Sequence, residues 1–127
     1  MKWLFMAFLN YAKFSGRATR REFWGFHFLD VIMIFVCLCV DISSAGYENL
    51  TPFSFQATFL WFVFTFIPLL AVAVRRLHDI NKSGAWYFVL FVPVLGFIIF
   101  YMFSLLPGTK GSNHYGSDPR SIFSNSF

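Results

Sequence analysis

Long apolar runs interrupted by compact arginine motifs constrain this chain more than any other feature of its sequence. The runs at 23–40, 53–74 and 85–106 contain few charged side chains, and each approaches the ~20 residues that cross a bilayer core as a helix. A chain of 127 residues, 57% of them hydrophobic, could not hide this much apolar surface from water. The sequence therefore predicts an all-α integral membrane protein.

Local start and stop signals divide the chain into elements. Thr19 and Glu22 match a capping box, in which the Thr19 hydroxyl accepts from the Glu22 amide and Glu22 reaches back to the Thr19 amide. Thr51-Pro52 marks a second helix start, and Pro68 and Pro93 predict kinks within the later spans. We expect a single membrane domain at 1–119, with an amphipathic interfacial helix at 1–14, transmembrane helices at 19–41, 52–76 and 84–106, and a structured, turn-rich tail at 107–119, followed by a flexible C-terminus at 120–127.

The distribution of lysine and arginine predicts the orientation. The N-terminal flank carries five of these residues, the loop at 42–50 none, the loop at 75–84 three and the tail two. Because positive residues favour the cytoplasmic side, the N-terminus is expected inside and the first loop outside. An odd number of spans would then place the C-terminus outside.

The basic residues beside the spans form a candidate collar at the membrane surface. One interpretation is that they bind anionic headgroups or an acidic partner, and the other is that they are ordinary positive-inside anchors. A fold-holding network is also expected, because Glu22 can reach Arg75 or Arg76 across helices and Arg75 and Asp79 are spaced i,i+4. The candidate headgroup or network residues are Arg17, Arg20, Arg21, Glu22, Arg75, Arg76, His78, Asp79 and Lys82.

Polar residues inside the predicted spans are a second candidate site. His27 and Asp30 are spaced i,i+3 on the first span, and Gln56 lies in the second. An acid at membrane depth costs several kcal/mol unless it is protonated or paired. These residues either form a proton or ion relay, or hold the helices together through bonds from Asp30 to Gln56, Thr65, Ser104 or an arginine.

Catalytic, cofactor and metal sites are not expected. His78-Asp79 and Ser83 are too close in sequence to form a triad readily, and no nucleophile motif is present. Cys37 and Cys39 point to different sides of a helix and have no metal-ligand spacing. The net charge of +4 is concentrated at membrane boundaries, which favours anionic headgroups over nucleic acid as its partner.

Several motifs together resemble a known bacterial family. They are Phe14-Ser15-Gly16-Arg17 with Arg21-Glu22-Phe23-Trp24, Arg75-Arg76-Leu77-His78-Asp79 with Lys82-Ser83-Gly84-Ala85-Trp86, and Leu106-Pro107-Gly108-Thr109 with the turn residues that follow. In this order they resemble the YhaH-like inner-membrane proteins, a family of unknown function catalogued as family eight-zero-five. The resemblance implies a bacterial cytoplasmic-membrane location. With that location, the lysine and arginine counts and three spans predict a periplasmic C-terminus. It implies no activity.

The expected function is that of a non-enzymatic accessory protein or subunit that contacts anionic lipids and packs against a membrane partner or a second copy of itself. The alternative is an oligomeric small transporter or channel whose polar pathway contains His27 and Asp30. The two differ in the packed face, because a conduit would turn its polar residues toward one water-filled axis.

Overall fold

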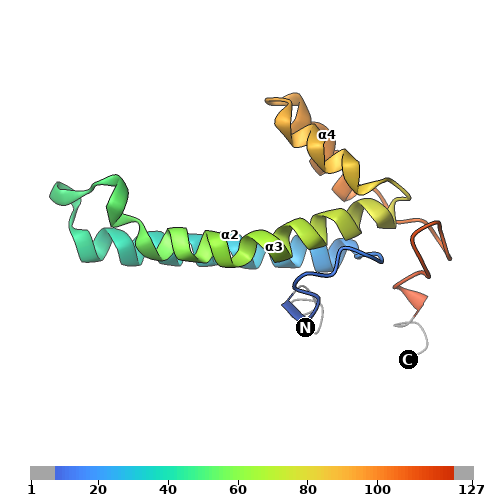
Figure 1. Ribbon diagram of the computed structural model, residues 1–127, viewed down its shortest axis with the longest axis horizontal. Helices are drawn as coiled ribbons and strands as arrows, with labels where there is room; N and C mark the ends of the chain where they lie inside the picture. The colour runs from blue at the N-terminus through green and yellow to red at the C-terminus, as the bar shows by residue number, and fades with distance from the viewer. Residues whose placement is uncertain (1–7, 122–127) are drawn as a thin grey trace.

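The computed structural model describes residues 8–121, and the regular elements in that range are helical. Helices α2 (Arg20–Ala45) and α3 (Gln56–Asp79) form a long antiparallel hairpin, joined by the short turns η1 (Tyr47–Asn49) and η2 (Pro52–Ser54) (Figure 1). The segments η3 (Gly84–Phe91) and α4 (Leu95–Leu105) form a shorter hairpin beside the other end of α3. Residues 1–7 of the predicted helix at 1–14 and residues 122–127 of the predicted flexible end lie outside the described residues.

Helix α2 begins where the sequence predicts. Thr19 is the N-cap, and its hydroxyl accepts a hydrogen bond of 3.2 Å from the Glu22 amide. Glu22 does not complete the expected capping box, because its carboxylate binds Arg75 instead. The helix continues to Ala45, beyond its predicted end at residue 41.

The start of α3 depends on a residue of α2. Pro52 begins only the short turn η2, and α3 starts at Gln56 rather than at the predicted residue 52. The buried carboxylate of Asp41 accepts hydrogen bonds from the amides of Ala57 (3.0 Å) and Thr58 (2.9 Å). Asp41 thus caps amides that the first turn of α3 cannot satisfy, and it fastens the two helices together at this end.

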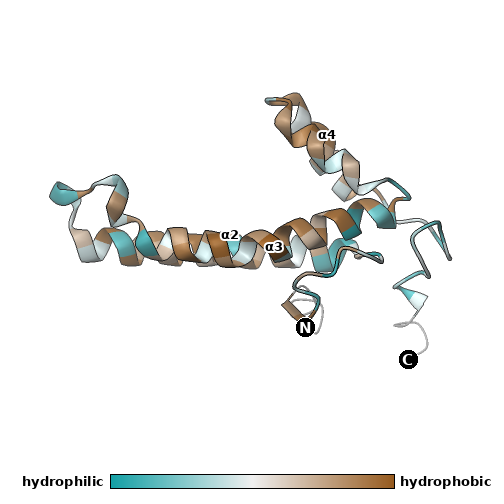
Figure 2. Ribbon diagram, in the orientation of Figure 1, coloured by the Kyte–Doolittle hydropathy of each residue, from teal (hydrophilic) through white to brown (hydrophobic). Residues whose placement is uncertain are grey.

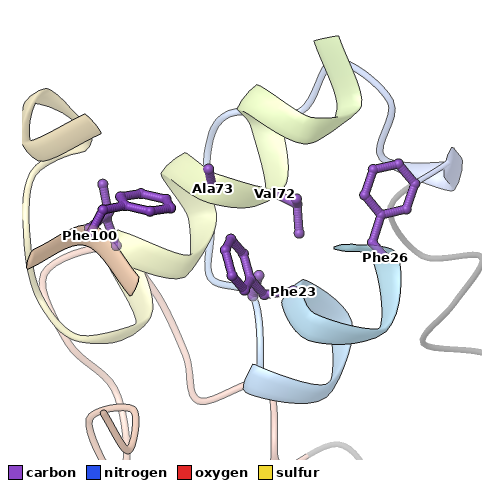
Figure 3. Close-up of a cluster of buried hydrophobic side chains, with 7 residues drawn as sticks. Phe23, Phe26, Val72, Ala73 and Phe100 are labelled. Carbon is purple, nitrogen blue, oxygen red and sulfur yellow. The ribbon is translucent and has the colours of Figure 1, made fainter. Parts of the chain in front are cut away.

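The apolar core lies where α2, α3 and α4 meet (Figure 3). Phe23 and Phe26 of α2 pack against Val72 and Ala73 of α3, and Phe100 of α4 adds a ring whose centroid is 6.0 Å from that of Phe23. Small residues on α3 let the aromatic rings of α2 approach its backbone closely. This core positions the ends of the helices, where the charged residues gather.

The region predicted as one transmembrane helix at 84–106 is instead a reversal. Trp86 stacks edge-on against Phe103, with ring centroids 5.4 Å apart, and Tyr87 packs in the same way on Phe100 at 5.7 Å. Residues early in η3 therefore lie beside residues late in α4. This antiparallel arrangement is incompatible with a continuous helix.

The reversal has identifiable local causes. Pro93 has no amide hydrogen, and Val94 adopts a φ of +63°, a left-handed conformation that a helix interior excludes. Gly96 packs so tightly that a Cβ added there would collide with the Val89 carbonyl. The amides of Leu95 and Gly96 donate to the carbonyls of Pro93 (2.7 Å) and Val92 (3.0 Å), so the turn satisfies its own donors.

Apolar and polar residues are segregated along the long hairpin. Its shaft is mainly hydrophobic, whereas polar residues gather toward both ends (Figure 2). Large apolar side chains such as Phe28, Phe35, Leu60 and Phe62 are more than half exposed. Helices α2 and α3 are long and apolar enough to cross a membrane, and such a shaft is stable where lipid surrounds it.

Candidate functional site

A buried carboxylate gathers arginines from distant parts of the chain. Asp79, at the end of α3, has no exposed surface. It accepts from Arg17 Nε at 3.0 Å, from Arg120 at 2.9 and 3.1 Å, and from Arg76 one helical turn away. We call this cluster, together with the Glu22–Arg75 pair and Asp118, the arginine network. Charges this deeply buried are tolerated only when they are paired and hydrogen-bonded.

The arginines of the network also bind backbone carbonyls. Arg76 donates to the carbonyls of Ser104 (3.1 Å), Ala18 (3.2 Å) and Leu106, and so reaches the C-terminal end of α4. Arg17 donates to the carbonyls of Gly111 (2.6 Å) and Thr109 in the tail. The guanidinium is suited to this role because its fixed fork holds several acceptors at once, and the last carbonyls of a helix lack partners within it.

A second ion pair joins α2 to α3 in the same layer. Arg75 Nη1 lies 2.5 Å from Glu22 Oε1, and both side chains are about 97% buried. The backbone adds a further link, because the Ala18 amide donates to the Arg75 carbonyl at 3.0 Å. The structure therefore brings Glu22 to Arg75, one of the two partners expected from the sequence. The expected Arg75–Asp79 pair is replaced by Arg76–Asp79.

The tail after α4 folds back onto this network. Tyr115 stacks on His78 with ring centroids 4.1 Å apart and planes 2° apart, and Asn113 Nδ2 donates to the His78 carbonyl at 2.9 Å. The Thr109 amide donates to the Asp79 carbonyl at 2.8 Å. His78 Nδ1 also lies 3.0 Å from the carbonyl of Gly16, so this ring joins the tail to the N-terminal segment.

The tail lies at the same end of the long hairpin as the segment that precedes α2. The carbonyls of Thr109 and Gly111 accept hydrogen bonds from Arg17, and both ends of the described chain lie at this end (Figure 1). The opposite placement was expected because residues 84–106 were counted as a span. Since that segment turns back on itself, the tail returns to the side from which η3 departs.

Asp118 and Arg120 link the network to solvent. Burial opposes the charge of Asp118, but hydrogen bonds from the amides of Arg120 (3.0 Å) and Gly111 (3.1 Å), and the Arg120 and Arg17 charges, hold its pKa below the ordinary value. Hydrogen bonds to Asp79 raise the pKa of Arg120. Both residues therefore remain charged at neutral pH.

A pH dependence follows from the depressed pKa of Asp118. Because the folded pKa lies below that of the unfolded chain, the carboxylate stabilises the fold above the ordinary value of 3.8, and this contribution disappears as pH falls through the folded pKa. In detergent, Asp118→Asn is expected to lower the thermal midpoint at pH 7, and the gap from wild type should close at an acidic pH below the folded pKa. A gap that is equal at both pH values would contradict this role.

Other basic residues of the predicted collar face outward. Arg20 and Arg21 are exposed, as is Lys110 of the tail, whereas Lys82 is half-buried over the rings of Trp86 and Phe103. We call Arg20, Arg21, Lys82 and Lys110 the basic rim. The structure thus divides the predicted collar into a buried part, which is neutralised by carboxylates and carbonyls, and an exposed part.

The polar residues within the spans do not share one axis. Asp30 is buried and accepts a hydrogen bond of 3.0 Å from the Trp61 indole of α3, a partner that the sequence did not indicate. Thr65 donates to the Trp61 carbonyl at 3.0 Å, and Gln56 is exposed near the far end of the hairpin. His27 packs between the rings of Phe23 and Tyr101.

These features define a helical membrane protein whose arginines and their carboxylate partners form a buried ion-pair network at one end of the long hairpin. The chain belongs to the family described as "Protein of unknown function (DUF805)", whose model matches residues 11–117. The family resemblance expected from the motifs is therefore confirmed, and two of its relatives are named inner membrane proteins.

Relatives match over nearly the whole chain. Inner membrane protein YhaI of Escherichia coli K12 is 39% identical over 94% of this chain and 97% of its own length. Inner membrane protein YhaH of the same strain is 34% identical over 94% and 98%. The uncharacterized protein YiiR is 30% identical over 95% and 90%. No solved structure matches significantly.

Sequence reasoning missed several members of the site. Arg120 was assigned to the flexible end, and Asp118 was treated only as part of a turn. Their signal is weak, because an acid and an arginine flanking Pro119 also fit an ordinary surface turn. Asp41 could have been found as an acid placed just beyond an apolar run and before a helix start.

Proposed function

We propose that this chain is a non-enzymatic accessory protein of the bacterial inner membrane. It holds its basic rim against anionic lipid headgroups at the cytoplasmic face and offers the long apolar hairpin to lipid or to another membrane protein. The observation that carries this proposal is the division of the basic residues, in which Arg17, Arg75 and Arg76 are buried and neutralised while Arg20 and Arg21 remain exposed. A rigid support that displays uncompensated positive charge suits a headgroup surface.

The proposed arrangement in the membrane follows from the hairpins. Helices α2 and α3 cross the bilayer, while η3 and α4, with 8 and 11 residues, each extend about 16 Å and so reach roughly halfway through a ~30 Å core. The η3–α4 hairpin therefore enters and leaves on one side. The basic residues of the N-terminal flank favour a cytoplasmic N-terminus, so both ends of the described chain then lie in the cytoplasm.

The contacts favour this proposal over a conduit. The Asp30 carboxylate is bonded to Trp61 within the α2–α3 pair, and Thr65 is bonded to the Trp61 carbonyl. The Asp30–Trp61 bond holds α2 to α3, as interhelical hydrogen bonds do in membranes, and the Thr65 bond lies within α3. A conduit would need these groups turned to a shared aqueous axis, and exposed Gln56 lies apart from them.

The proposal predicts a preference for anionic lipid that depends on salt. In neutral maltoside micelles, adding phosphatidylglycerol is expected to raise the thermal midpoint more than adding phosphatidylcholine, because each rim charge gains about 1 kcal/mol near anionic headgroups. The triple variant Arg20→Gln, Arg21→Gln and Lys110→Gln should lose most of this difference, as should wild type at 1 M salt.

Glu48→Gln is the matched control, since it changes an exposed charge at the opposite end of the hairpin. It should retain the wild-type preference. Equal midpoints in the two lipids, or a preference that persists in the triple variant, would refute the proposed role of the rim.

A further inference from the structure

A small cavity opens beside the arginine network, between the N-terminal segment and the tail. It has a volume of about 280 Å³. Arg17, Glu22 and Arg75 line one part of it, Lys13 another, and the tail contributes Tyr115 and Ser117. It therefore lies at the end of the hairpin that carries the basic rim, and it is bounded by segments that are far apart in the sequence.

Arg75, one of the residues that line this cavity, has an unused guanidinium edge. Its Nη1 is held by Glu22, but Nε and Nη2 are buried and have no hydrogen-bond partner among the described residues. These two nitrogens form the side of the guanidinium that binds two oxygens of a carboxylate or phosphate in parallel. Buried donors are almost always satisfied, so two adjacent unpartnered nitrogens on a residue that lines a cavity point to a missing oxyanion.

The charges of the cavity favour an anion. Arg17 is paired with Asp79, and Glu22 is engaged with the opposite side of Arg75, so Lys13 supplies the excess positive charge of the lining. Glu22 therefore fixes the orientation of the fork without occupying its free edge. The hydroxyl groups of Tyr115 and Ser117 add polar groups to the wall, as in sites where a few convergent groups fix a ligand.

We propose that this cavity binds one phosphate group, either the headgroup phosphate of an anionic lipid or free phosphate. Arg75 holds two of its oxygens through Nε and Nη2, and Lys13 neutralises a further charge. Because the Arg75 nitrogens have almost no exposed surface, the groups that cover them shift to admit the anion, and the exposed Lys13 side chain then closes over it. If the ligand is a lipid, the inference rests on the proposed contact with headgroups and adds to it one defined binding site per chain.

The first test is native mass spectrometry of the full chain, purified in maltoside and incubated with phosphatidylglycerol or phosphatidylcholine. Wild type is expected to retain one phosphatidylglycerol at low lipid excess. Arg75→Lys preserves the charge and a possible bond to Glu22 but removes the fork, and retention should fall about tenfold because a bidentate contact is lost. Lys13→Gln should reduce retention without disturbing the buried pair, so the test does not depend on the folding of Arg75→Lys.

Glu48→Gln is the matched control, because it changes an exposed charge at the opposite end of the hairpin and leaves both the rim and the cavity unchanged. A second arm measures the thermal midpoint with inorganic phosphate against sodium chloride at equal ionic strength. Stabilisation by phosphate that is lost in Lys13→Gln identifies free phosphate as a ligand, whereas selective lipid retention alone identifies the headgroup.

The inference is overturned if wild type neither retains phosphatidylglycerol above phosphatidylcholine nor responds to phosphate, or if Arg75→Lys and Lys13→Gln bind as wild type does. Failure of the proposed function gives a different result. The lipid preference is then insensitive to the rim triple variant, while retention of the single lipid still depends on Lys13 and Arg75.

Discussion

Asp79→Asn is expected to destabilise the protein by about 3–5 kcal/mol, the range found when one partner of a buried ion pair is removed. The substitution keeps the shape of the side chain but leaves Arg17 and Arg76, which are 8% and 1% exposed, without their carboxylate. Thermal unfolding in detergent and the amount of protein in the membrane fraction would both report this loss.

Two further variants are expected to change the stability much less than Asp79→Asn does. Arg120→Gln should cost less than about 1 kcal/mol, because the Arg120 side chain is 38% exposed and exposed ion pairs contribute little. Glu48→Gln changes an exposed acid far from the network and should be neutral. If Asp79→Asn unfolded at the same temperature as Glu48→Gln, Asp79 would not be the centre of the fold-holding network.

Cysteines placed at Trp86 and Phe103, with Cys37 and Cys39 changed to serine, should be joined nearly completely by a thiol cross-linker shorter than ~10 Å. The two rings are 5.4 Å apart in the η3–α4 hairpin, whereas a straight α-helix would separate the residues by about 26 Å. Mass spectrometry of the linked peptides measures the yield.

A matched pair, Trp86→Cys with Val94→Cys, should stay unlinked, because Val94 lies at the turn and a straight helix would also place it about 12 Å away. If the first pair were linked only between two copies of the chain, or not at all, a continuous third helix would be the correct description.

The side of the membrane on which the tail lies is measured separately. Ser112→Cys, with Cys37 and Cys39 changed to serine, should react with an impermeant maleimide only after the cytoplasmic face of the membrane is opened to the reagent.

The predictable parts of this fold are those with local causes. The start of α2 follows from Thr19, because a capping hydroxyl and its amide are only three residues apart. The apolar shaft follows from composition alone. The Glu22–Arg75 contact could be predicted from the sequence because each residue flanks an apolar run, and the two runs have similar lengths.

The remaining features depend on tertiary contacts. Hydropathy is nearly uniform through 84–106, so it cannot distinguish a span from two half-length limbs, and Pro93 alone predicts only a kink. The reversal also needs Gly96, which permits close approach to the Val89 carbonyl. Asp79 selects Arg17 and Arg120, residues 62 and 41 positions away, through the path of the whole chain.

The contacts of the tail set an order of assembly during biosynthesis. Ribosomes release the N-terminal part of a chain first, so Arg17, Arg76 and Asp79 are made before their acceptors at 104–111 and before Arg120. Until those residues emerge from the ribosome, Arg17, Arg76 and Asp79 lack some of their hydrogen-bond and ion-pair partners. The last described segment to be translated therefore completes the folding of the first, and a chain halted before it would leave charged surface open to quality-control proteases.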